Sequence, residues 1–364
     1  MVEKSRTIIK ATGSYIPDKV VKNEDFLNNT FYDTSGNLIP KSNEEIIQKF
    51  EEITGIKERR YVPDDMVASD ISYLAAKDAL DNSGIDKETI DYIIVAHNFG
   101  DIRKENPYSD FVPSIAARVK SRLNIENPYC VATDLPFGCP GWLQGIIQAD
   151  FFMKSSGAKR ALVIGAETLS RVCDPHDRDS MLYSDGAGAT ILEKVETDEN
   201  VGILSHISRS DTKDHAFMLV MGKSYNPDYP GNNLFLKMQG HKLYKYSLQH
   251  VPVTVKKSIE NAGLTLDDIS KVFIHQANEK MDEEILRRLY GLYDQKNKPS
   301  KDIYDIMPMT ISWLGNSSVA TLPTLIDLTR KEKIEGHVYE SGNTIVMTSV
   351  GAGMNINTVV YRIP

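Results

Sequence analysis

The chain has 364 residues, of which 41% are hydrophobic and 25% are charged, and its formal net charge is -8. This length and composition exclude a disordered or fibrous chain, and they are typical of a globular protein large enough for two domains. The negative charge argues against a nucleic-acid-binding surface, so we expect the partners to be small molecules or proteins.

No targeting or membrane segment is evident in the sequence. The N-terminal segment lacks the apolar region of a signal peptide, and no run reaches the roughly 18 apolar residues of a membrane span. We therefore expect a cytoplasmic protein without a membrane partner. Its cysteines, Cys130, Cys139 and Cys173, are too few and too irregularly spaced for a disulfide framework, so each is expected to be a free thiol.

Apolar strand patterns and helical patterns alternate along the chain. Runs rich in β-branched residues predict buried strands at residues 92–96, 161–165, 272–274 and 344–348. Helical periodicity predicts helices at residues 71–82, 141–154, 248–261 and 279–290. The alternation predicts an α/β fold with largely buried strands.

An internal repeat indicates that the chain consists of two duplicated halves, which we place at residues 1–195 and 196–364. The segment 82–95 recurs at 261–274 with a helix end, a glycine and a buried strand in the same order. A second echo aligns Gly138-Cys-Pro with Gly315-Asn-Ser, and a third aligns Ser-Gly pairs that precede a strand at 156–157 and 341–342. Three echoes in one order favour duplication over a chance likeness of short α/β units.

Cys139 lies in the sequence Gly-Cys-Pro-Gly, directly ahead of a predicted helix. Since Pro140 suits the first helical position, we expect Cys139 to be the N-cap. A thiol at a helix N-terminus faces the positive end of the helix dipole, so we predict a lowered pKa and a reactive thiolate. Free cysteines are usually small buried hydrophobes, and we keep that interpretation for Cys130 and Cys173.

His275 and Asn316 are the other residues whose positions suggest chemistry. His275 ends an apolar strand, where a lone histidine is more often structural, but α/β folds also gather their sites at that end of their strands. Asn316 would by default be a helix N-cap, and that role is compatible with catalysis. The segment 173–178 offers metal ligands only superficially, because its proline favours a loop. The glycine-rich tracts at 185–189 and 351–353 lack the spacing of a phosphate- or dinucleotide-binding loop.

Taken together, these segments resemble the β-ketoacyl-acyl-carrier-protein synthase III family. They occur in the family's order and at similar separations: Thr54-Gly-Ile-Lys-Glu-Arg-Arg60, the Cys139 segment, residues 173–178, residues 185–189, His275-Gln-Ala-Asn278, Gly315-Asn-Ser-Ser and residues 351–353. The resemblance covers nearly the whole chain. It implies a duplicated five-layer αβαβα thiolase-like fold, a homodimer, and a catalytic site formed by Cys139, His275 and Asn316.

The resemblance also implies an activity. An acyl-coenzyme A or acyl-carrier-protein thioester would acylate Cys139, and the acyl group would condense with malonyl carrier protein by decarboxylation, in fatty acid or polyketide-type biosynthesis. His275 and Asn316 would stabilise the enolate, and no metal or redox cofactor would be required. Carried over residue by residue, the family's substrate-binding positions are Arg178, Gly240, Asn278, Gly351, Ala352 and Gly353. The position carried over for docking of the carrier protein is Lys280.

Several departures from the family pattern leave the acyl specificity open. Pro140 and Trp142 replace small residues near the nucleophile, no tryptophan precedes Thr54, and residues 31–42 and 101–110 look like insertions. One alternative is an acyltransferase that passes the acyl group to a hydroxyl or amine without condensation. An alternative of another class is a non-catalytic dimer partner, although such subunits usually lose the nucleophile. A thiolase would need a second cysteine near 351–353, which is absent.

Overall fold

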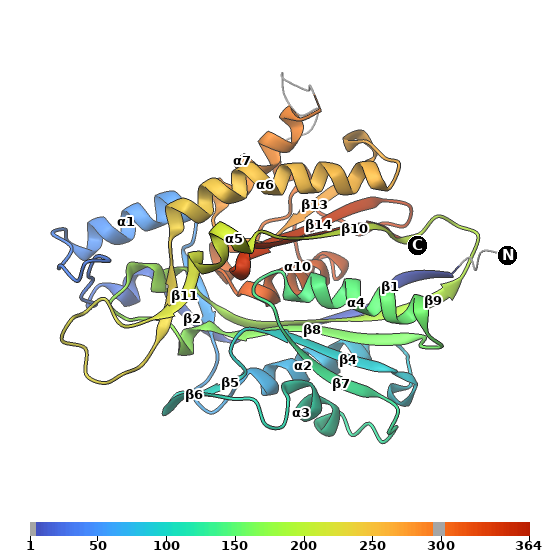
Figure 1. Cartoon of the computed structure of the whole chain (residues 1–364), viewed down its shortest axis with the longest axis horizontal. Helices are drawn as coiled ribbons and strands as arrows, with labels where there is room; N and C mark the ends of the chain where they lie inside the picture. The colour runs from blue at the N-terminus through green and yellow to red at the C-terminus, as the bar shows by residue number, and fades with distance from the viewer. Residues whose placement is uncertain (1–4, 294–302) are drawn as a thin grey trace.

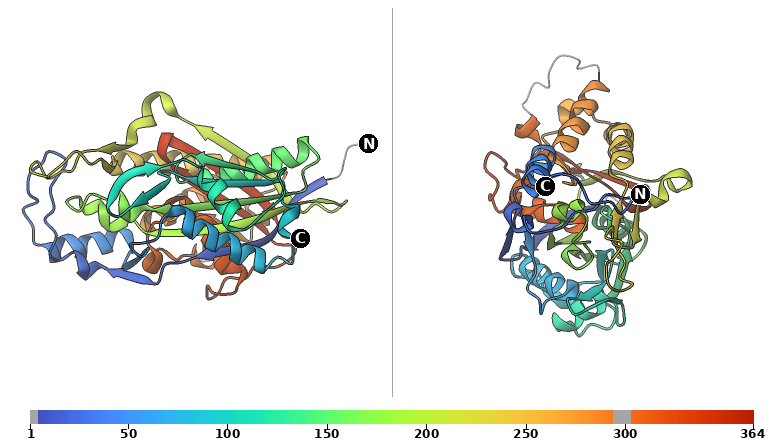
Figure 2. Two further views of the ribbon diagram at one scale, coloured as in Figure 1. Left: turned by 90° about the horizontal axis from the view of Figure 1, so that it is seen from below. Right: turned by 90° about the vertical axis from the view of Figure 1, so that its left-hand side faces the viewer.

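The structure, a computed structural model, describes residues 5–293 and 303–364. Figure 1 shows two β-sheets with helices between them and helices on both outer faces. The views in Figure 2 show the same layers from two further sides. The order of layers is helix, sheet, helix, sheet and helix, as expected for the five-layer αβαβα arrangement.

The first sheet has the strand order β1-β9-β8-β4-β7. Strand β4 runs parallel to both β7 and β8, whereas β9 runs antiparallel to β8 and to β1. Its strands are β1 (Ser5–Tyr15), β4 (Tyr92–His97), β7 (Val131–Pro136), β8 (Arg160–Thr168) and β9 (Asp185–Glu196). The chain then passes to the second sheet, so the division that we propose between residues 195 and 196 lies at the end of β9.

The second sheet repeats this pattern with the order β10-β15-β14-β13. Strand β13 is parallel to β14, and β15 is antiparallel to β14 and to β10, so each strand has a counterpart in the first sheet. Its strands are β10 (Gly202–Ser210), β13 (Lys271–Ile274), β14 (Thr344–Gly351) and β15 (Asn355–Arg362). In the described residues no strand matches β7. Beside β13, the side chain of Gln276 instead donates to Pro308 O at 2.8 Å and accepts from Thr310 N at 2.8 Å.

Two helices form the middle layer, α4 (Gly141–Ser155) and α10 (Thr321–Arg330), and each contacts both sheets. The outer helices are α2 (Ala68–Asp81) and α3 (Ile115–Arg122) on the first sheet, with α6 (Gly240–Asn261) and α7 (Glu279–Gly291) on the side of the second. None of the helices in the described ranges is long and apolar enough to cross a membrane.

The middle layer is packed so closely that two glycines of the first sheet touch α10 and the 3-10 turn Ser318–Ala320 that precedes it. A Cβ atom at Gly165 would lie 2.4 Å from Val319 O, and one at Gly188 would lie 2.6 Å from Pro323 Cβ. Atoms this close cannot coexist, so only glycine fits either position. Helix α4 is buried on most of its surface because it packs between the two sheets, with Leu143 and Ile146 nearly inaccessible.

The predicted elements lie where the sequence placed them, with one large difference in length. Helix α6 begins at Gly240, eight residues before the predicted start at residue 248. Its first two turns are largely polar, but Leu243 and Tyr246 share a buried face that continues the later pattern. The segment between α1 (Asn43–Thr54) and the preceding short 3-10 helix contains the expected insertion at 31–42.

This insertion packs against the loop at residues 173–178. Tyr32 N donates to His176 O at 2.9 Å, and the rings of these two residues meet edge to face. The loop itself is fixed from the other side by Lys237, whose Nζ lies 2.5 Å from Asp174 Oδ2 and 3.1 Å from Asp177 Oδ2. Asp174 and Asp177 therefore form ion pairs with Lys237, which lies on β12 (Phe235–Met238).

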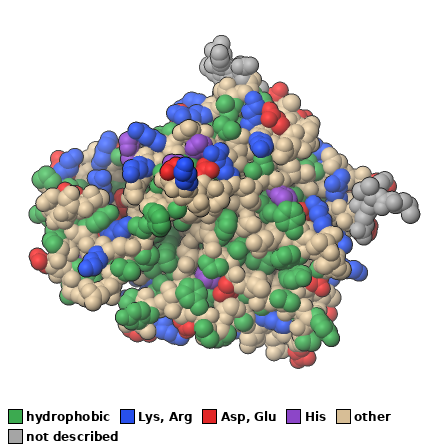
Figure 3. All heavy atoms as spheres, viewed as in Figure 1, with side chains coloured by type: hydrophobic (Ala, Val, Ile, Leu, Met, Phe, Trp, Pro, Cys, Tyr) green, Lys and Arg blue, Asp and Glu red, His purple; other side chains and the backbone are tan. Residues whose placement is uncertain are grey.

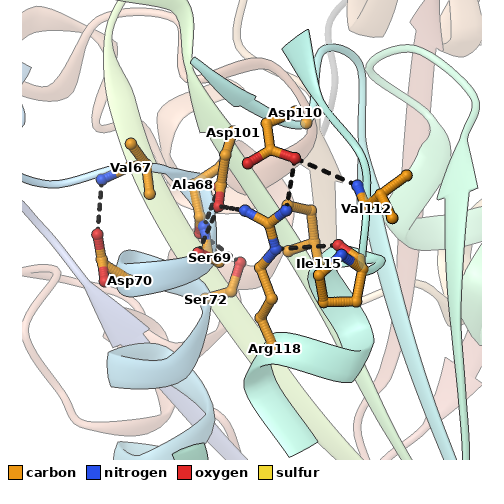
Figure 4. A network of polar contacts seen from close by, with 12 residues as sticks. Val67, Ala68, Ser69, Asp70, Ser72, Asp101, Asp110, Val112, Ile115 and Arg118 are labelled. Atoms are coloured by element: carbon orange, nitrogen blue, oxygen red, sulfur yellow. Dashed lines mark hydrogen bonds and ion pairs between the residues drawn. The ribbon is translucent and has the colours of Figure 1, made fainter. Parts of the chain in front are cut away.

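The insertion at 101–110 forms a hairpin of β5 (Asp101–Arg103) and β6 (Asn106–Asp110). Arg118 of α3 fixes its base, as Figure 4 shows: the guanidinium lies 2.6 Å from Asp101 Oδ2 and 2.7 Å from Asp110 Oδ1. Arg118 Nε also donates to Pro113 O at 2.9 Å. Arg118 therefore holds both ends of the hairpin and the loop that follows it.

Two further antiparallel pairs and three short helices complete the strands and α-helices of the described residues. Strands β11 (Leu219–Gly222) and β12 form one pair, and β2 (Lys19–Lys22) and β3 (Glu58–Tyr61) form the other. The short helices are α5 (Thr212–His215), α8 (Ile303–Ile306) and α9 (Ile311–Leu314).

Candidate active site

Cys139 lies in the tight turn that leads into α4. Gly138, with φ of 81°, reverses the chain, and Gln144 N then donates the first helical hydrogen bond to Pro140 O at 3.0 Å. Pro140 is therefore the N-cap, and the prediction that Cys139 occupies this position was wrong by one residue. The thiol still lies at the N-terminal end of a 15-residue helix.

The environment of the thiol contradicts the predicted lowering of its pKa. Burial raises the pKa of Cys139 to about 11, and the nearby Glu167 carboxylate adds to the rise, while a hydrogen bond from Ser318 opposes it. Ser318 Oγ donates to Cys139 Sγ at 3.1 Å. The cost of burying a charged sulfur therefore exceeds the effect of the hydrogen bonds that favour the thiolate. At neutral pH the resting group is a thiol, so it needs a proton acceptor to react.

His275 directly follows β13, and its backbone N donates to Thr348 O at 2.9 Å, which extends the pairing with β14. Its ring is buried, and among the described residues Nδ1 has no hydrogen-bond partner. Burial lowers the pKa of His275 to about 4. The imidazole is therefore neutral at physiological pH, and a neutral imidazole can either accept a proton or donate a hydrogen bond.

Asn316 lies in the turn before α10, pinned by its backbone to the segment that precedes β9. Its N donates to Leu182 O at 3.0 Å, and its O accepts from Ser184 N at 2.9 Å. The side-chain Oδ1 accepts from Ser318 N at 2.8 Å, which leaves Nδ2 as the end that can donate to a ligand. The default expectation of a helix N-cap is wrong, because Ser317 is the N-cap of the 3-10 turn Ser318–Ala320.

The C-terminal tract at 351–353 lies directly against the nucleophile. A Cβ atom at Gly351 would lie 2.7 Å from Cys139 N, and one at Gly138 would lie 3.0 Å from Ala352 N. Glycine on both sides lets the two backbones approach, which brings the N–H groups of Cys139 and Ala352 to adjoining segments. Two such donors beside a nucleophile are what an oxyanion hole requires.

All three predicted catalytic residues line one cavity of about 280 Å³. Besides Cys139, His275 and Asn316 the lining is largely apolar, and it includes Leu219, Val220, Met221, Leu236, Met238, Leu243 and Met281. Figure 3 shows apolar side chains gathered around a hollow on this face, close to the place where Figure 1 labels β11. A cavity of this kind suits an aliphatic chain whose reactive end meets polar groups.

The residues expected to bind substrate are divided by the structure. Gly351 and Ala352 line the cavity, whereas the other four residues do not. Gly240 begins α6, and Gly353 follows Ala352 with φ of 82°. Asn278 is the N-cap of α7, where its side chain accepts from Met281 N at 3.1 Å. Arg178 is exposed at the start of a 3-10 turn, and Lys280, expected to dock the carrier protein, is exposed in the first turn of α7.

Three polar residues near the nucleophile were not identified from the sequence. Asn98 and Ser318 line the cavity, and Glu167 lies behind it at the end of β8 with 1% of its surface exposed. Glu167 lies near the end of the buried apolar strand β8, and a charged residue within such a strand is the sequence signal that could have identified it. Ser318 lies two residues after Asn316, but nothing in the sequence indicates that its hydroxyl faces Cys139.

Comparison with known proteins identifies the family. Residues 133–212 match 3-oxoacyl-[acyl-carrier-protein] synthase III, and residues 259–363 match the C-terminal part of that family. Over 98% of its length the chain is 32% identical to the β-ketoacyl-[acyl-carrier-protein] synthase III of Ehrlichia canis, and it covers 99% of that protein. The chain belongs to the β-ketoacyl-acyl-carrier-protein synthase III family. The synthase III of Paracoccus denitrificans is 30% identical, with 98% of this chain and 99% of the relative covered.

Solved structures of synthase III enzymes have the same fold. That of Thermus thermophilus superposes with a TM-score of 0.79 at 28% identity, covering 98% of this chain and 99% of the other. The Aquifex aeolicus enzyme superposes with a TM-score of 0.77 at 28% identity, and the coverage of the two chains is the same. The priming β-ketosynthase of the R1128 polyketide pathway shares the fold, with a TM-score of 0.79 at 23% identity, covering 100% and 98%. The thiolase-like fold and the assignment to the synthase III acyltransferases, which are condensing enzymes, are thus confirmed.

Proposed function

We propose that Cys139 accepts an acyl group from a thioester and that His275 and Asn316 then promote decarboxylative condensation with a malonyl thioester. The observation that carries this proposal is that all three side chains line one largely apolar cavity, with the Gly351–Ala352 backbone beside the sulfur. The polar end supplies the nucleophile and hydrogen-bond donors, and the apolar walls accept the acyl chain.

In the first step the thiol proton of Cys139 must leave as the sulfur attacks the thioester carbonyl. The final acceptor of this proton is the departing thiolate of the donor, so the step needs no net proton uptake, and His275, whose pKa burial lowers to about 4, stays neutral. The N–H groups of Cys139 and Ala352 would hold the negative oxygen of the tetrahedral intermediate. When the donor carbon–sulfur bond breaks, the departing thiolate takes up the thiol proton of Cys139, and the products are acyl-Cys139 and a free thiol.

In the second step the malonyl carboxylate leaves as carbon dioxide, and its bonding electrons form an enolate. The ring N–H of His275 and Nδ2 of Asn316 would donate to the enolate oxygen. The enolate carbon attacks acyl-Cys139, the bond to sulfur breaks, and the thiolate takes a proton from water. The product is a β-ketoacyl thioester.

The rim of the cavity carries lysines that suit an acidic carrier protein. Leu243 of α6 and Met281 of α7 line the cavity, while Lys242, Lys245 and Lys280 beside them in sequence are exposed. Figure 3 shows basic side chains above the hollow, over the part of the molecule that includes α6. We therefore infer that a malonyl or acyl carrier protein docks on these lysines, since a positive rim attracts an acidic partner even on a protein of negative net charge.

A homodimer is the proposed assembly. Strand β7 ends the first sheet, and no strand in the described residues covers its outer edge. Around this edge Tyr129 and Val112 are each 85% exposed, and Val131 is 47% exposed. An open strand edge flanked by apolar side chains is typical of a surface that pairs with another chain.

The decisive experiment measures intact mass after incubation with a panel of acyl thioesters, followed by release of carbon dioxide from malonyl carrier protein. We expect one acyl adduct, mapped to Cys139, and rapid decarboxylation once that adduct is present. Acylation without decarboxylation, with transfer to a hydroxyl or amine acceptor, would support the acyltransferase alternative. No adduct with any thioester would support the non-catalytic alternative.

A further inference from the structure

Two buried polar residues, Glu167 and Ser318, and the half-buried Asn98 form a hydrogen-bonded chain that ends at the sulfur of Cys139. Glu167 lies at the end of β8, Asn98 directly follows β4, and Ser318 lies in the turn before α10. Asn98 Nδ2 donates to Glu167 Oε2 and also to Ser318 Oγ at 3.2 Å. Ser318 Oγ in turn donates to Cys139 Sγ at 3.1 Å. The chain joins both halves of the protein at the nucleophile.

The chain has only one consistent direction. Asn98 N also donates to Glu167 Oε2, at 3.0 Å, so two N–H groups converge on that oxygen. Above its pKa of about 7 the Glu167 carboxylate is ionised and can only accept, so it fixes the amide of Asn98 with its nitrogen toward Glu167 and Ser318. Because Ser318 Oγ accepts from Asn98, its own hydrogen is left for the sulfur. A hydroxyl that would otherwise rotate freely is thereby held as a donor.

The backbone of Ser318 supports this arrangement. Ser318 has φ of 51°, in the left-handed region that serine rarely adopts, and its N–H donates to Asn316 Oδ1 at 2.8 Å. A conformation of this kind persists only where the surroundings determine it, and it is often found at functional sites. Ser318 thus contacts the nucleophile through its side chain and a second predicted catalytic residue through its backbone.

Glu167 also acts on the thiol through its charge. Its carboxylate contributes to the raised pKa of Cys139, and burial raises the pKa of Glu167 itself to about 7. The other titratable groups that face Glu167 are His97 at the end of β4, which lowers its pKa, and Asp185 at the start of β9, which raises it. His97 is paired in turn with Asp134, at 3.1 Å. The charge of Glu167 disfavours the Cys139 thiolate, whereas the hydrogen-bonded chain that Glu167 orients favours the thiolate.

We propose that Glu167 is a positioning residue for the nucleophile, which fixes the Asn98 amide and through it holds the Ser318 hydroxyl as a hydrogen-bond donor to the Cys139 sulfur. The inference rests on Cys139 being the nucleophile of the proposed function, and it extends that function to three residues outside the predicted catalytic set. Glu167 does not line the cavity, so it acts on the reaction through these neighbours and through its charge, without touching the reacting atoms.

The test is the pH dependence of Cys139 alkylation by iodoacetamide in the full-length protein, followed by peptide mapping. Only the thiolate reacts, so the midpoint of the rate profile reports the pKa of the thiol. Replacing Ser318 with alanine removes the donor, so the midpoint should move up and the rate at pH 8 should fall by about three- to tenfold. Asn98→Ala should act in the same direction. Ser317→Ala is the matched control, because Ser317 Oγ contacts Thr321 rather than the sulfur.

Two substitutions of Glu167 separate orientation from charge. In Glu167→Gln the amide oxygen can still accept from Asn98 while the charge is removed, so the midpoint should move down and alkylation at pH 8 should become faster. In Glu167→Leu the charge and the acceptor are both lost, so alkylation should be slower than in Glu167→Gln. Loss of packing alone does not explain a faster nucleophile in Glu167→Gln together with slower alkylation in Glu167→Leu than in Glu167→Gln.

Each outcome decides the proposal. Identical profiles for Glu167→Gln and Glu167→Leu, or an unchanged profile for Ser318→Ala, would overturn it. Should Glu167→Leu fail to fold by circular dichroism, the comparison of Glu167→Gln, Asn98→Ala and Ser318→Ala still decides, because these three must shift in the stated directions. Alkylation needs no acyl donor, so failure of the proposed condensation leaves this test intact and is measured separately.

Discussion

The two turns that lead into the middle-layer helices begin alike and end differently. Gly138 and Gly315 both have positive φ, of 81° and 62°, and each is followed by a predicted catalytic residue. After Cys139 the chain enters α4 within two residues. After Asn316 it first makes the 3-10 turn Ser318–Ala320, and α10 begins only at Thr321.

This difference shows how a duplicated frame acquires an asymmetric site. The shared part, a glycine turn before a buried helix, brings Cys139 and Asn316 to corresponding places in the two halves. The added 3-10 turn then directs the Ser318 hydroxyl at the sulfur, 3.1 Å away. The matching turns place Cys139 and Asn316, and the added 3-10 turn in the second half places the Ser318 donor.

The largest effect is expected from removing the thiol of the first turn. Cys139→Ala should abolish the acyl adduct and lower condensation by at least about four orders of magnitude, because no other group can carry the acyl chain. Intact-mass measurement and a coupled condensation assay check both. Cys173→Ala is the control and should retain the adduct. An adduct that persists in Cys139→Ala would show that another residue is the nucleophile.

Substitutions on the other half should separate the two steps. His275→Ala and Asn316→Ala each remove a donor to the enolate, so condensation should fall by roughly two to four orders of magnitude while acyl loading is largely retained. Single-turnover loading and decarboxylation of malonyl carrier protein are the two measurements. If a folded variant lost both steps equally, its assigned role in decarboxylation would be wrong.

The glycines of the two turns allow a direct comparison. A Cβ at Gly138 would lie 3.0 Å from Ala352 N, whereas one at Gly315 would lie 2.9 Å from Arg59 Cβ. Both alanine variants should lose about 1–3 kcal/mol of unfolding free energy, from backbone strain and crowding. Gly138→Ala should also slow acyl loading, because it displaces Ala352. Gly84→Ala is the control, since Gly84 has φ of 66° but open space around it. Urea titration measures the unfolding free energy, and loading kinetics measure the rate of acylation. A smaller loss of unfolding free energy in Gly138→Ala and Gly315→Ala than in Gly84→Ala would contradict the predicted crowding.

The smallest effect concerns the surface of the second half. Lys280→Glu should raise KM for malonyl carrier protein by a few-fold at low salt, and by less at high salt, because the attraction is electrostatic. Loading from a short acyl-pantetheine thioester should be unchanged. Arg287→Glu is the matched control, since Arg287 already pairs with Glu284 at 3.3 Å. Equal losses with both substrates would indicate a damaged site rather than a docking surface.

The sequence predicted the fold, because buried strands and glycine turns are local patterns that recur in both halves. It also predicted that Cys139, His275 and Asn316 belong together, and the cavity that they share supports this. It did not predict the direction of the Cys139 pKa shift, because burial depends on residues distant in the chain. The role of Ser318 was not predicted for the same reason, because its hydroxyl donates to the Cys139 sulfur, which lies 179 positions earlier in the sequence.

The contacts at Gly165 and Gly188 have a practical consequence for engineering. Gly165 meets the backbone of the turn before α10, and Gly188 meets the rigid ring of Pro323, so no flexible side chain can absorb a change in spacing. Substitutions intended to alter chain-length preference are better made on β11 and β12, whose side chains line the cavity. The contacts at Gly165 and Gly188 fix the spacing between the sheet and the helix, whereas the cavity wall formed by β11 and β12 is the part that substitutions can adjust.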